Sequence, residues 1–471
     1  MTTQLLSKHP FCQLLSGLLI AASQAITAAP AESEQLSHGE YVNILGDCVA
    51  CHTVPGGEPF AGGLKLPTPI GDIIATNITP SSTTGIGDYT LEQFDAAVRK
   101  GVRADGKRLY PAMPYTAYAK VSDEDIAAMY QWFMNEVEPS DYQPPRTELP
   151  FPFNIRISMA AWNLLFLDDE PFTPDASQTE QWNRGAYLVE GLTHCGTCHS
   201  PRNLLMAESS TGALSGGAVG AWSAPDITPD PDTGIGDWST EEIVQYMKTG
   251  SIAKSQASGP MAEAVDHSLR YVTDEDLQAM AVYLKSVPAG EREDIDQAVH
   301  TWGEQGNQLA EVRGVGWPDD PDQLSGPQLF DAYCAACHQA SGQGTPDAVM
   351  PALFNNTATG RTQTNNLALV ILGGIHWVSE GHEIHMPGFA HELSDQQIAT
   401  LSNYLLDLYG NPDAQVTSDQ VQGLREGTAT ADGQPDLVLL ARIGILVGVI
   451  VVVLILAWRV RHRRRRTRAR N

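Results

Sequence analysis

Three copies of the motif Cys-x-x-Cys-His constrain this 471-residue chain more than any other feature. They are Cys48-Val-Ala-Cys51-His52, Cys195-Gly-Thr-Cys198-His199 and Cys334-Ala-Ala-Cys337-His338. Two cysteines three residues apart lie on one helical turn, so both thiols can bond to the two vinyl groups of one haem while the adjacent imidazole binds the iron. The motifs therefore predict three covalently bound haem c groups, with the three motif histidines as iron ligands.

Cys-x-x-Cys also occurs in zinc sites and in thioredoxin-like redox pairs. A zinc ribbon needs two pairs for each metal, and three pairs leave one unmatched. Neither alternative accounts for a histidine directly after every second cysteine. Six of the seven cysteines belong to the motifs, and the seventh, Cys12, lies in an N-terminal segment that we expect to be removed.

Residues 1–31 resemble a secretory signal peptide. Lys8 and His9 precede an apolar run over residues 11–26, and small residues follow at Ala28, Ala29 and Ala31. Cleavage after Ala29 and cleavage after Ala31 both stay open. Export agrees with haem attachment at this motif, which takes place outside the bacterial cytoplasm.

Residues 437–458 form a 22-residue apolar stretch whose only charge is Arg442. A helix of that length spans roughly 33 Å, which is enough for the hydrocarbon core of a bilayer. Eight arginines follow in residues 459–471 and favour a cytoplasmic location for this tail. The sequence therefore predicts a C-terminal transmembrane helix with a basic cytoplasmic tail.

The part of the chain between leader and span is strongly acidic. It holds all 56 Asp and Glu residues, and ten of the 29 Lys and Arg residues lie in the leader, the span or the tail, which leaves 19. The resulting formal charge of −37 argues against nucleic acid as a partner and for a heavily solvated surface.

Internal repeats divide the exported part. The segment 76–89, with Asn-Ile-Thr-Pro and Gly-Ile-Gly-Asp, recurs at 225–238 as Asp-Ile-Thr-Pro and Gly-Ile-Gly-Asp. We expect a mainly α fold of three tandem class I cytochrome c-like domains. The expected boundaries are 1–31 signal peptide, 32–140 domain 1, 141–177 linker, 178–290 domain 2, 291–320 linker, 321–410 domain 3, 411–436 linker, 437–458 transmembrane helix and 459–471 tail.

Each unit is predicted to end on an amphipathic helix that starts at a capping box. The boxes are Ser122-x-x-Asp125, Thr273-x-x-Asp276 and Ser394-x-x-Gln397. A short helix precedes each motif and carries Gly39, Gly185 or Gly326, which suits close crossing of the first and last helices. Met129 and Met280 lie on the apolar stripes of the last helices, so we expect them to be core residues.

The sixth iron ligand is the remaining assignment. Met113 lies 61 residues after His52, and Met261 lies 62 residues after His199, so the matched spacing supports a thioether ligand in both units. In the third unit Met386 precedes the last helix as Met113 does. The competing residues there are Met350, which we expect to line the pocket, and His376, His382, His385 and His391.

With these motifs in place, the chain resembles the three-haem cytochrome c subunit of bacterial membrane-bound alcohol, gluconate and sorbitol dehydrogenases. The resemblance rests on residues 46–53, 76–80, 85–88, 109–114 and 194–202 and covers nearly the whole exported part. It implies that a separate subunit carrying PQQ or FAD oxidises the substrate on the periplasmic side. The cytochrome would pass the electrons to ubiquinone in the inner membrane. The C-terminal span is a departure, because members of that family attach to membranes in different ways.

No motif for substrate chemistry is present in the sequence: there is no Gly-x-Gly-x-x-Gly that opens a βαβ unit, no nucleophile elbow and no His-Glu-x-x-His. We therefore expect an electron relay without a substrate-oxidising site. The alternatives are a cytochrome that feeds or belongs to a terminal oxidase, and a haem peroxidase or sensor. The latter needs an open axial position, which three candidate methionines disfavour.

Overall fold

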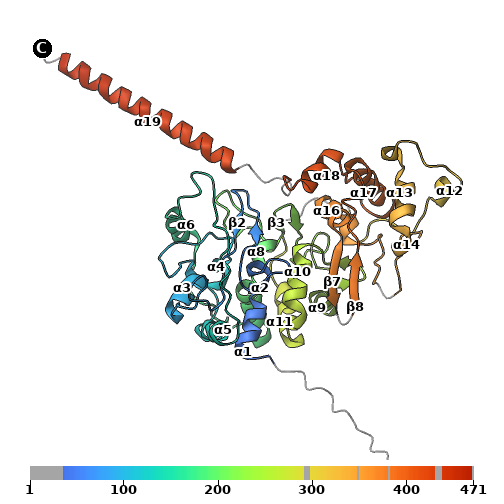
Figure 1. The fold of residues 1–471 in the computed structure, drawn as a ribbon, viewed down its shortest axis with the longest axis horizontal. Helices are drawn as coiled ribbons and strands as arrows, with labels where there is room; N and C mark the ends of the chain where they lie inside the picture. The colour runs from blue at the N-terminus through green and yellow to red at the C-terminus, as the bar shows by residue number, and fades with distance from the viewer. Residues whose placement is uncertain (1–35, 291–296, 347–348, 380–381, 430–436, 469–471) are drawn as a thin grey trace, which may run out of the picture. The chain divides into compact units, whose positions relative to one another are not determined.

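The computed structural model describes residues 36–290, 297–346, 349–379, 382–429 and 437–468 (Figure 1). The expected signal peptide lies outside these residues. The chain is mostly helical, as predicted, and its strands form short antiparallel pairs.

The elements of each repeat follow one another in a similar order. The first repeat contains α1 (His38–Leu45), α2 (Cys48–His52), β1 (Lys65–Leu66), β2 (Ile73–Ile74), α3 (Leu91–Lys100), α4 (Tyr115–Tyr118) and α5 (Asp123–Asn135), and is followed by α6 (Ser158–Phe166). The second contains α7 (Glu180–Tyr187), the π-helix η1 (Leu188–Leu192), α8 (Gly196–His199), β3 (Gly217–Val219), β4 (Trp222–Ala224), α9 (Thr240–Thr249), β5 (Ser251–Ile252), β6 (Ser255–Gln256), α10 (Pro260–His267), the 3-10 helix η2 (Leu269–Tyr271) and α11 (Asp274–Leu284).

The third repeat is preceded by α12 (Leu309–Val312) and the 3-10 helix η3 (Pro321–Gln323). It contains α13 (Gly326–Tyr333), α14 (Ala335–His338), α15 (Thr357–Gly360), α16 (Asn365–Gly373), β7 (Ile375–Ser379), β8 (His382–Met386) and α17 (Asp395–Tyr409), and is followed by α18 (Ser418–Arg425) and α19 (Leu437–Arg468). Each motif thus lies between a first helix and a later last helix of its repeat.

Glycine allows the first and last helices of every repeat to cross closely. A Cβ added to Gly39, Gly185 or Gly326 would lie closer than 3.0 Å to Ala128 of α5, Ala279 of α11 or Tyr404 of α17. Any larger side chain would therefore force the helices apart. The predicted close crossing is confirmed in all three repeats.

The predicted capping boxes form only in part. Ser122, Thr273 and Ser394 all accept a hydrogen bond from the backbone amide three residues later, but the reciprocal bond is present only at Ser394. The carboxylates of Asp125 and Asp276 face the neighbouring repeat instead. This differs from the sequence-based expectation because each carboxylate has a tyrosine partner outside its own helix.

These two carboxylates join the first two repeats in a reciprocal way. Tyr41 of α1 donates to Asp276 Oδ2 at 2.8 Å, and Tyr187 of α7 donates to Asp125 Oδ2. Each tyrosine hydroxyl also accepts from the N-cap amide beside its partner, at 3.2 Å from Thr273 and 3.1 Å from Ser122. The first two repeats are therefore related by an approximate twofold exchange of equivalent contacts, as in an isologous dimer.

The buried side chains follow the same division. A single apolar cluster runs through the first and second repeats and includes Met129 and Met280, each 1% exposed, so the core assignment of these methionines is confirmed. The third repeat has its own cluster around α13, α16 and α17. Trp377 of β7 is the exception, because it packs into the cluster of the first two repeats.

The third repeat contacts the second through side-chain hydrogen bonds and through one aromatic ring. Asn366 pairs with both the amide and the carbonyl of Ser223 on β4, at 2.9 and 2.8 Å. Thr357 donates to Ser255 Oγ at 2.8 Å. The ring of Trp377 covers Gly250, where a Cβ would lie 3.1 Å from the indole. The second repeat therefore contacts both of the others.

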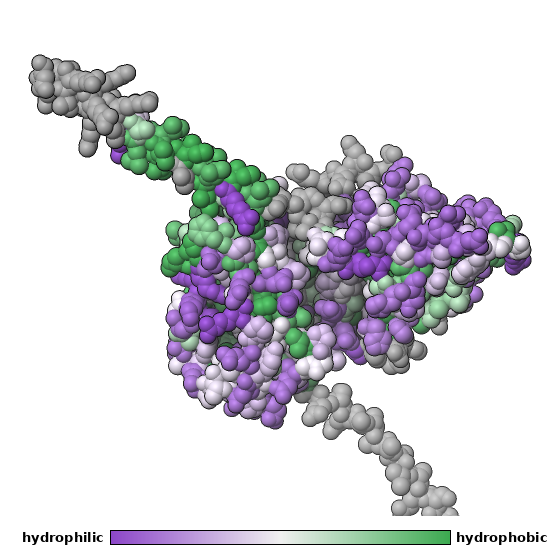
Figure 2. Space-filling model, turned by 45° about the horizontal axis from the view of Figure 1, so that its top comes forward, coloured by the Kyte–Doolittle hydropathy of each residue, from purple (hydrophilic) through white to green (hydrophobic). Residues whose placement is uncertain are grey.

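All three expected linkers contain helices, which are α6, α12 and α18. In α18 a Thr417 capping box starts the helix, and Val421 and Leu424 bury one face against the cluster of the third repeat. Helix α19 contains a 23-residue candidate span, Leu437–Arg459, with a mean hydropathy of 3.0. Figure 2 shows mostly apolar residues along this helix, with a hydrophilic patch near its start. The predicted apolar stretch is thus one helix.

Candidate functional site

Each Cys-x-x-Cys-His motif lies on a single short helical turn. Helix α2 spans its whole motif, and α8 and α14 begin one residue after their first cysteine. The residues before the first two motifs, Asp47 and His194, have φ values of 48° and 39°. This left-handed backbone turns the chain sharply from the preceding helix into the motif. The two thiols of each motif therefore share one turn, as the spacing predicts.

The three motif histidines are held by one repeated contact. The Nδ1 atoms of His52, His199 and His338 lie 2.6, 2.7 and 3.0 Å from the backbone carbonyl oxygens of Thr76, Pro225 and Pro351. A carbonyl oxygen can only accept, so each Nδ1 must carry the proton and donate it. Each Nε2 then keeps a free lone pair, which is the form that binds iron.

Burial shapes the titration of these groups. It lowers the pKa of all three motif imidazoles, which favours the neutral, ligating form. Burial also raises the pKa of Cys48 and of Cys334 to about 12. These side chains are therefore largely shielded from solvent, which fits a haem pocket.

The six described cysteines are free thiols. Within the described part of the chain, no three His, Cys, Asp or Glu side chains come together as a metal-binding group. The cysteine pairs of different motifs are thus not arranged as a four-ligand zinc site. Donor types, helical turn and histidine tautomer all fit one haem at each motif.

The first two motifs lie close to each other. Burial, followed by the charge of Asp47, raises the pKa of Cys51 to about 12. Tyr118 bridges the approaches to both motifs. Its hydroxyl donates to Gly46 O at 2.6 Å, and its ring packs edge-on against His194 with centroids 5.4 Å apart.

The candidate sixth ligands of the first two repeats occupy comparable places. Met113 lies in a turn between Tyr110 and α4. Met261 is the second residue of α10, which begins directly after Gly259 with φ 51°. Both side chains are partly buried and pack against the shared apolar cluster. Their environment fits a thioether ligand, and their bond to iron remains a prediction.

In the third repeat the strand register separates Met386 from its competitors. Met386 pairs with Ile375 at the end of β8, and His385 pairs with His376. Because side chains alternate along a strand, Met386 lies on the opposite face from the two histidines. Met386 is partly buried, whereas His376, His385 and His391 are exposed. The side chain of His382 lies outside the described residues.

Sequence reasoning missed the three carbonyl acceptors. They lie 24, 26 and 13 residues after their motif histidines. In the first two repeats each acceptor directly precedes the repeated Asn/Asp-Ile-Thr-Pro segment. That segment, shared by both copies at nearly the same distance from the histidine, is the signal from which the contact could have been inferred.

Comparisons with known proteins show the family of the chain. A cytochrome c family model matches residues 183–288 and 324–409, which include the second and third motifs. The cytochrome subunit of fructose dehydrogenase from Gluconobacter japonicus is 42% identical over 93% of both chains. The gluconate 2-dehydrogenase cytochrome c subunit of Pantoea cypripedii is 39% identical over 88% of this chain and 96% of its own.

The cytochrome c subunit of alcohol dehydrogenase (quinone) from Gluconobacter oxydans strain 621H is 38% identical over 87% of this chain and 86% of its own. All three relatives cover the chain nearly from end to end. The predicted resemblance is therefore confirmed, and the chain belongs to the family of cytochrome c electron-transfer subunits of dehydrogenase complexes.

Proposed function

We propose that this chain carries three haem c groups and relays electrons from a dehydrogenase subunit with PQQ or FAD to ubiquinone. The haems would be attached at Cys48 and Cys51, at Cys195 and Cys198, and at Cys334 and Cys337. Met113, Met261 and Met386 would complete the iron coordination opposite the motif histidines. The substrate would be oxidised by the partner subunit and not by this chain.

The observation that carries the proposal is the Nδ1-to-carbonyl contact at all three motif histidines. It fixes the tautomer that presents Nε2 to a metal and keeps the ring from turning. When bound, haem iron supplies one-electron transfer by cycling between two oxidation states. Partly buried methionines beside the shared core would exclude water from the opposite side, which disfavours a peroxidase-like open site.

The packing of the repeats supports a relay. The first and second motifs are neighbours through Tyr118, which contacts Gly46 before the first motif and His194 before the second. The β7–β8 hairpin, which carries Met386, packs through Trp377 against the cluster that also contacts Met261. Electron transfer slows steeply with the distance between centres, so this arrangement suits transfer through the second repeat.

The membrane location follows from the two ends of the sequence. We infer export by residues 1–31, haem units in the periplasm, and anchoring in the inner membrane by residues 437–458 with the arginine-rich tail in the cytoplasm. The hydropathy of the span and the positive charge next to it support this orientation.

The haem number is tested by measuring haem per chain in the purified full-length protein, together with its intact mass. We expect three haems, and one fewer in each variant that replaces both cysteines of one motif by serine. A wild-type mass with fewer than three added haems would contradict the proposal.

The relay is tested by comparing the isolated chain with its complex. Alone, the cytochrome should be reduced by chemical reductants and should not react with alcohols, aldehydes or sugars. With its dehydrogenase subunit, substrate should reduce the haems and ubiquinone analogues should reoxidise them. Reduction by substrate in the absence of a second subunit would overturn the assignment.

A further inference from the structure

A buried donor in the second repeat has no acceptor. Trp238 is 7% exposed and stacks edge-on with Tyr246 of α9 at a centroid distance of 5.3 Å. Its Nε1 makes no hydrogen bond within the described part of the chain. Leaving such an N–H buried and unpaired costs about 1–3 kcal/mol, so the position calls for an acceptor that the polypeptide does not provide.

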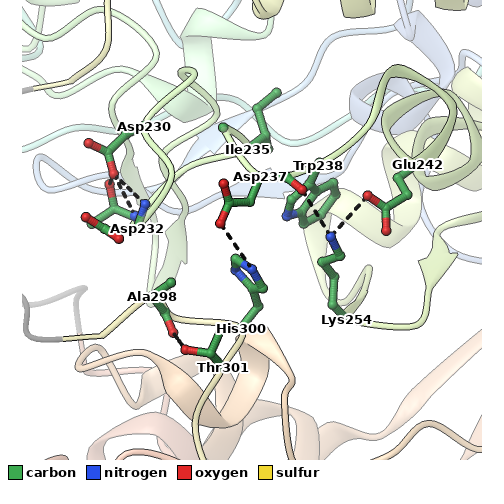
Figure 3. Close-up of polar contacts among 12 residues, drawn as sticks. Asp230, Asp232, Ile235, Asp237, Trp238, Glu242, Lys254, Ala298, His300 and Thr301 are labelled. Atoms are coloured by element: carbon green, nitrogen blue, oxygen red, sulfur yellow. Dashed lines mark hydrogen bonds and ion pairs between the residues drawn. The ribbon is translucent and has the colours of Figure 1, made fainter.

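The loop that carries Trp238 is held firmly. Asp230 Oδ1 accepts from the amides of Asp232 and Thr233 at 2.9 and 2.8 Å. Lys254 donates to Asp237 O at 3.3 Å and to Glu242 at 3.0 Å. Figure 3 shows these contacts, with His300 of the following segment next to Asp237. The indole is therefore presented on a fixed loop.

A cation from the third repeat reaches the same loop. Arg361 Nη1 donates to Thr233 O at 3.3 Å, and the guanidinium makes no other hydrogen bond and no ion pair among the described residues. The nearby carboxylate of Asp226 accepts instead from Thr228 N and Thr233 Oγ1, at 2.7 and 2.8 Å. Most of the five N–H donors of Arg361 thus remain available.

The backbone places this arginine. Gly360 precedes Arg361, and a Cβ on Gly360 would lie closer than 3.0 Å to Val299 O of the connecting segment. Val299 in turn donates its amide to Asp232 O at 2.9 Å. The connecting segment therefore fixes the start of the Arg361 side chain against the second repeat.

Arg361 also lies near the second motif. Thr233, whose carbonyl oxygen accepts from Arg361, donates its hydroxyl to Asp226. Asp226 directly follows Pro225, whose carbonyl oxygen lies 2.7 Å from Nδ1 of His199. Burial lowers the pKa of Arg361 itself, while Tyr246 and Asp226 act in the opposite direction. The guanidinium, Tyr246, which packs on Trp238, and the motif histidine thus share one neighbourhood.

We propose that Arg361 and Trp238 bind a propionate carboxylate of the haem attached at Cys195 and Cys198, so that the third repeat completes the haem site of the second. A carboxylate only accepts hydrogen bonds, and its negative charge would pair with a guanidinium that makes no ion pair among the described residues. The inference rests on the proposed haem attachment at the second motif.

The consequence for redox behaviour has a definite sign. The oxidised haem carries one more positive charge than the reduced haem, so a nearby guanidinium disfavours oxidation. Replacing Arg361 should therefore lower the reduction potential of the second haem. We expect a shift in the ratio of reduced to oxidised haem of about tenfold at fixed potential, which is about 59 mV for a one-electron couple.

The test is a spectroelectrochemical titration of the full-length holoprotein and its variants. R361Q should lower one of three redox waves, W238F should lower the same wave by less, and R361K should retain most of the wild-type potential. The variant M261H should lower that wave too and so assign it to the second haem. R425Q is the matched control, because Arg425 is an arginine of similar burial that pairs with Asp395 at 2.7 Å.

The proposal is overturned if R361Q and W238F leave all three waves in place, or if they move a wave other than the one that M261H moves. If R361Q does not fold, W238F decides the matter, since it removes one N–H from a ring that stays buried. Haem per chain is measured in parallel. Fewer than three haems in the wild type would contradict the proposed function, whereas three haems with unmoved waves would contradict this inference alone.

Discussion

At the scale of the residue, the three motif histidines share a neutral acceptor. Thr76, Pro225 and Pro351 each contribute a backbone carbonyl rather than a carboxylate. A carboxylate would draw the Nδ1 proton, make the imidazole a stronger donor to iron and favour the oxidised state. A neutral carbonyl acceptor does not have this effect on the potential. Because the carbonyl belongs to the backbone, a side-chain substitution at Thr76, Pro225 or Pro351 does not remove it. A haem at these motifs would thus have a higher potential than one whose histidine donates to a carboxylate.

The sixth ligands give the first residue-scale prediction. If each supplies one of three thioether ligands, as proposed, replacing Met113, Met261 or Met386 by alanine should remove about one third of the near-infrared sulfur-to-iron absorption of the oxidised protein. M129L is the control, since Met129 is a core methionine that is 1% exposed. If M386A kept the full near-infrared absorption and H376Q or H385Q changed the spectrum of the third haem, the sixth ligand of that haem would be a histidine.

At the scale of the element, the glycine crossings could be predicted from sequence, because Gly39, Gly185 and Gly326 recur before each motif. The apolar stripes alone predict that the last helix of each repeat provides the surface that these glycines contact. The half-formed capping boxes could not be predicted. The Ser-x-x-Asp pattern is satisfied locally, but Tyr187 and Tyr41 compete for the carboxylates, and that competition exists only after the repeats have packed.

The crossing glycines give an element-scale prediction. G185A should lower the thermal unfolding midpoint of the holoprotein by the equivalent of about 2–3 kcal/mol, because the new Cβ would collide with the backbone of Ala279. G373A is the matched control: a Cβ there meets nothing within 4 Å, and alanine favours the end of α16. Equal stability of G185A and wild type would show that α7 and α11 can separate without cost.

The helices within the expected linkers illustrate another limit of sequence reading. The Pro-rich flanks of residues 141–177 and the short apolar run there predict a connection, and α6 forms because Trp162 and Asn163 are buried on the first two repeats. In α18 only two apolar residues, Val421 and Leu424, are buried. So short a stripe carries little signal until the third repeat supplies the surface that it covers.

At the scale of the whole molecule, the internal duplication is expressed in the packing. Besides the exchanged tyrosines, each shared carboxylate is paired within its own repeat: His38 lies 2.8 Å from Asp125, and Arg184 lies 2.6 Å from Asp276. The duplication could be read from the repeated segments at 76–89 and 225–238. The mutual packing could not, because a repeat in sequence does not specify which surfaces its copies share.

This exchange gives a prediction about the joint between the first two repeats. Y41F and Y187F should each destabilise the holoprotein by about 1–2 kcal/mol, because each leaves a largely buried carboxylate and an N-cap amide without the hydroxyl. The two effects should be similar, since the contacts are equivalent. Y142F is the control, because Tyr142 is 46% exposed. Thermal unfolding is measured for Y41F, Y187F and Y142F. An unchanged unfolding midpoint in both Y41F and Y187F would show that these contacts do not stabilise the joint.

The C-terminal helix gives the last prediction. A chain that stops after residue 436 loses the 23-residue apolar helix and the arginine tail but keeps every element that carries a motif or a candidate ligand. The strongly acidic part that is left lacks the roughly 30 Å of apolar helix that a membrane span needs, so it should not insert into a bilayer. We expect the truncated chain to carry three haems and to appear in the soluble periplasmic fraction of cells that lack the dehydrogenase subunit.

A truncation of only the residues after Arg459 is the control and should stay in the membrane. If the longer truncation also remained tightly bound to membranes, the exposed apolar side chains of α6, Leu164 at 86% and Leu165 at 67% exposure, would be the next surface to mutate.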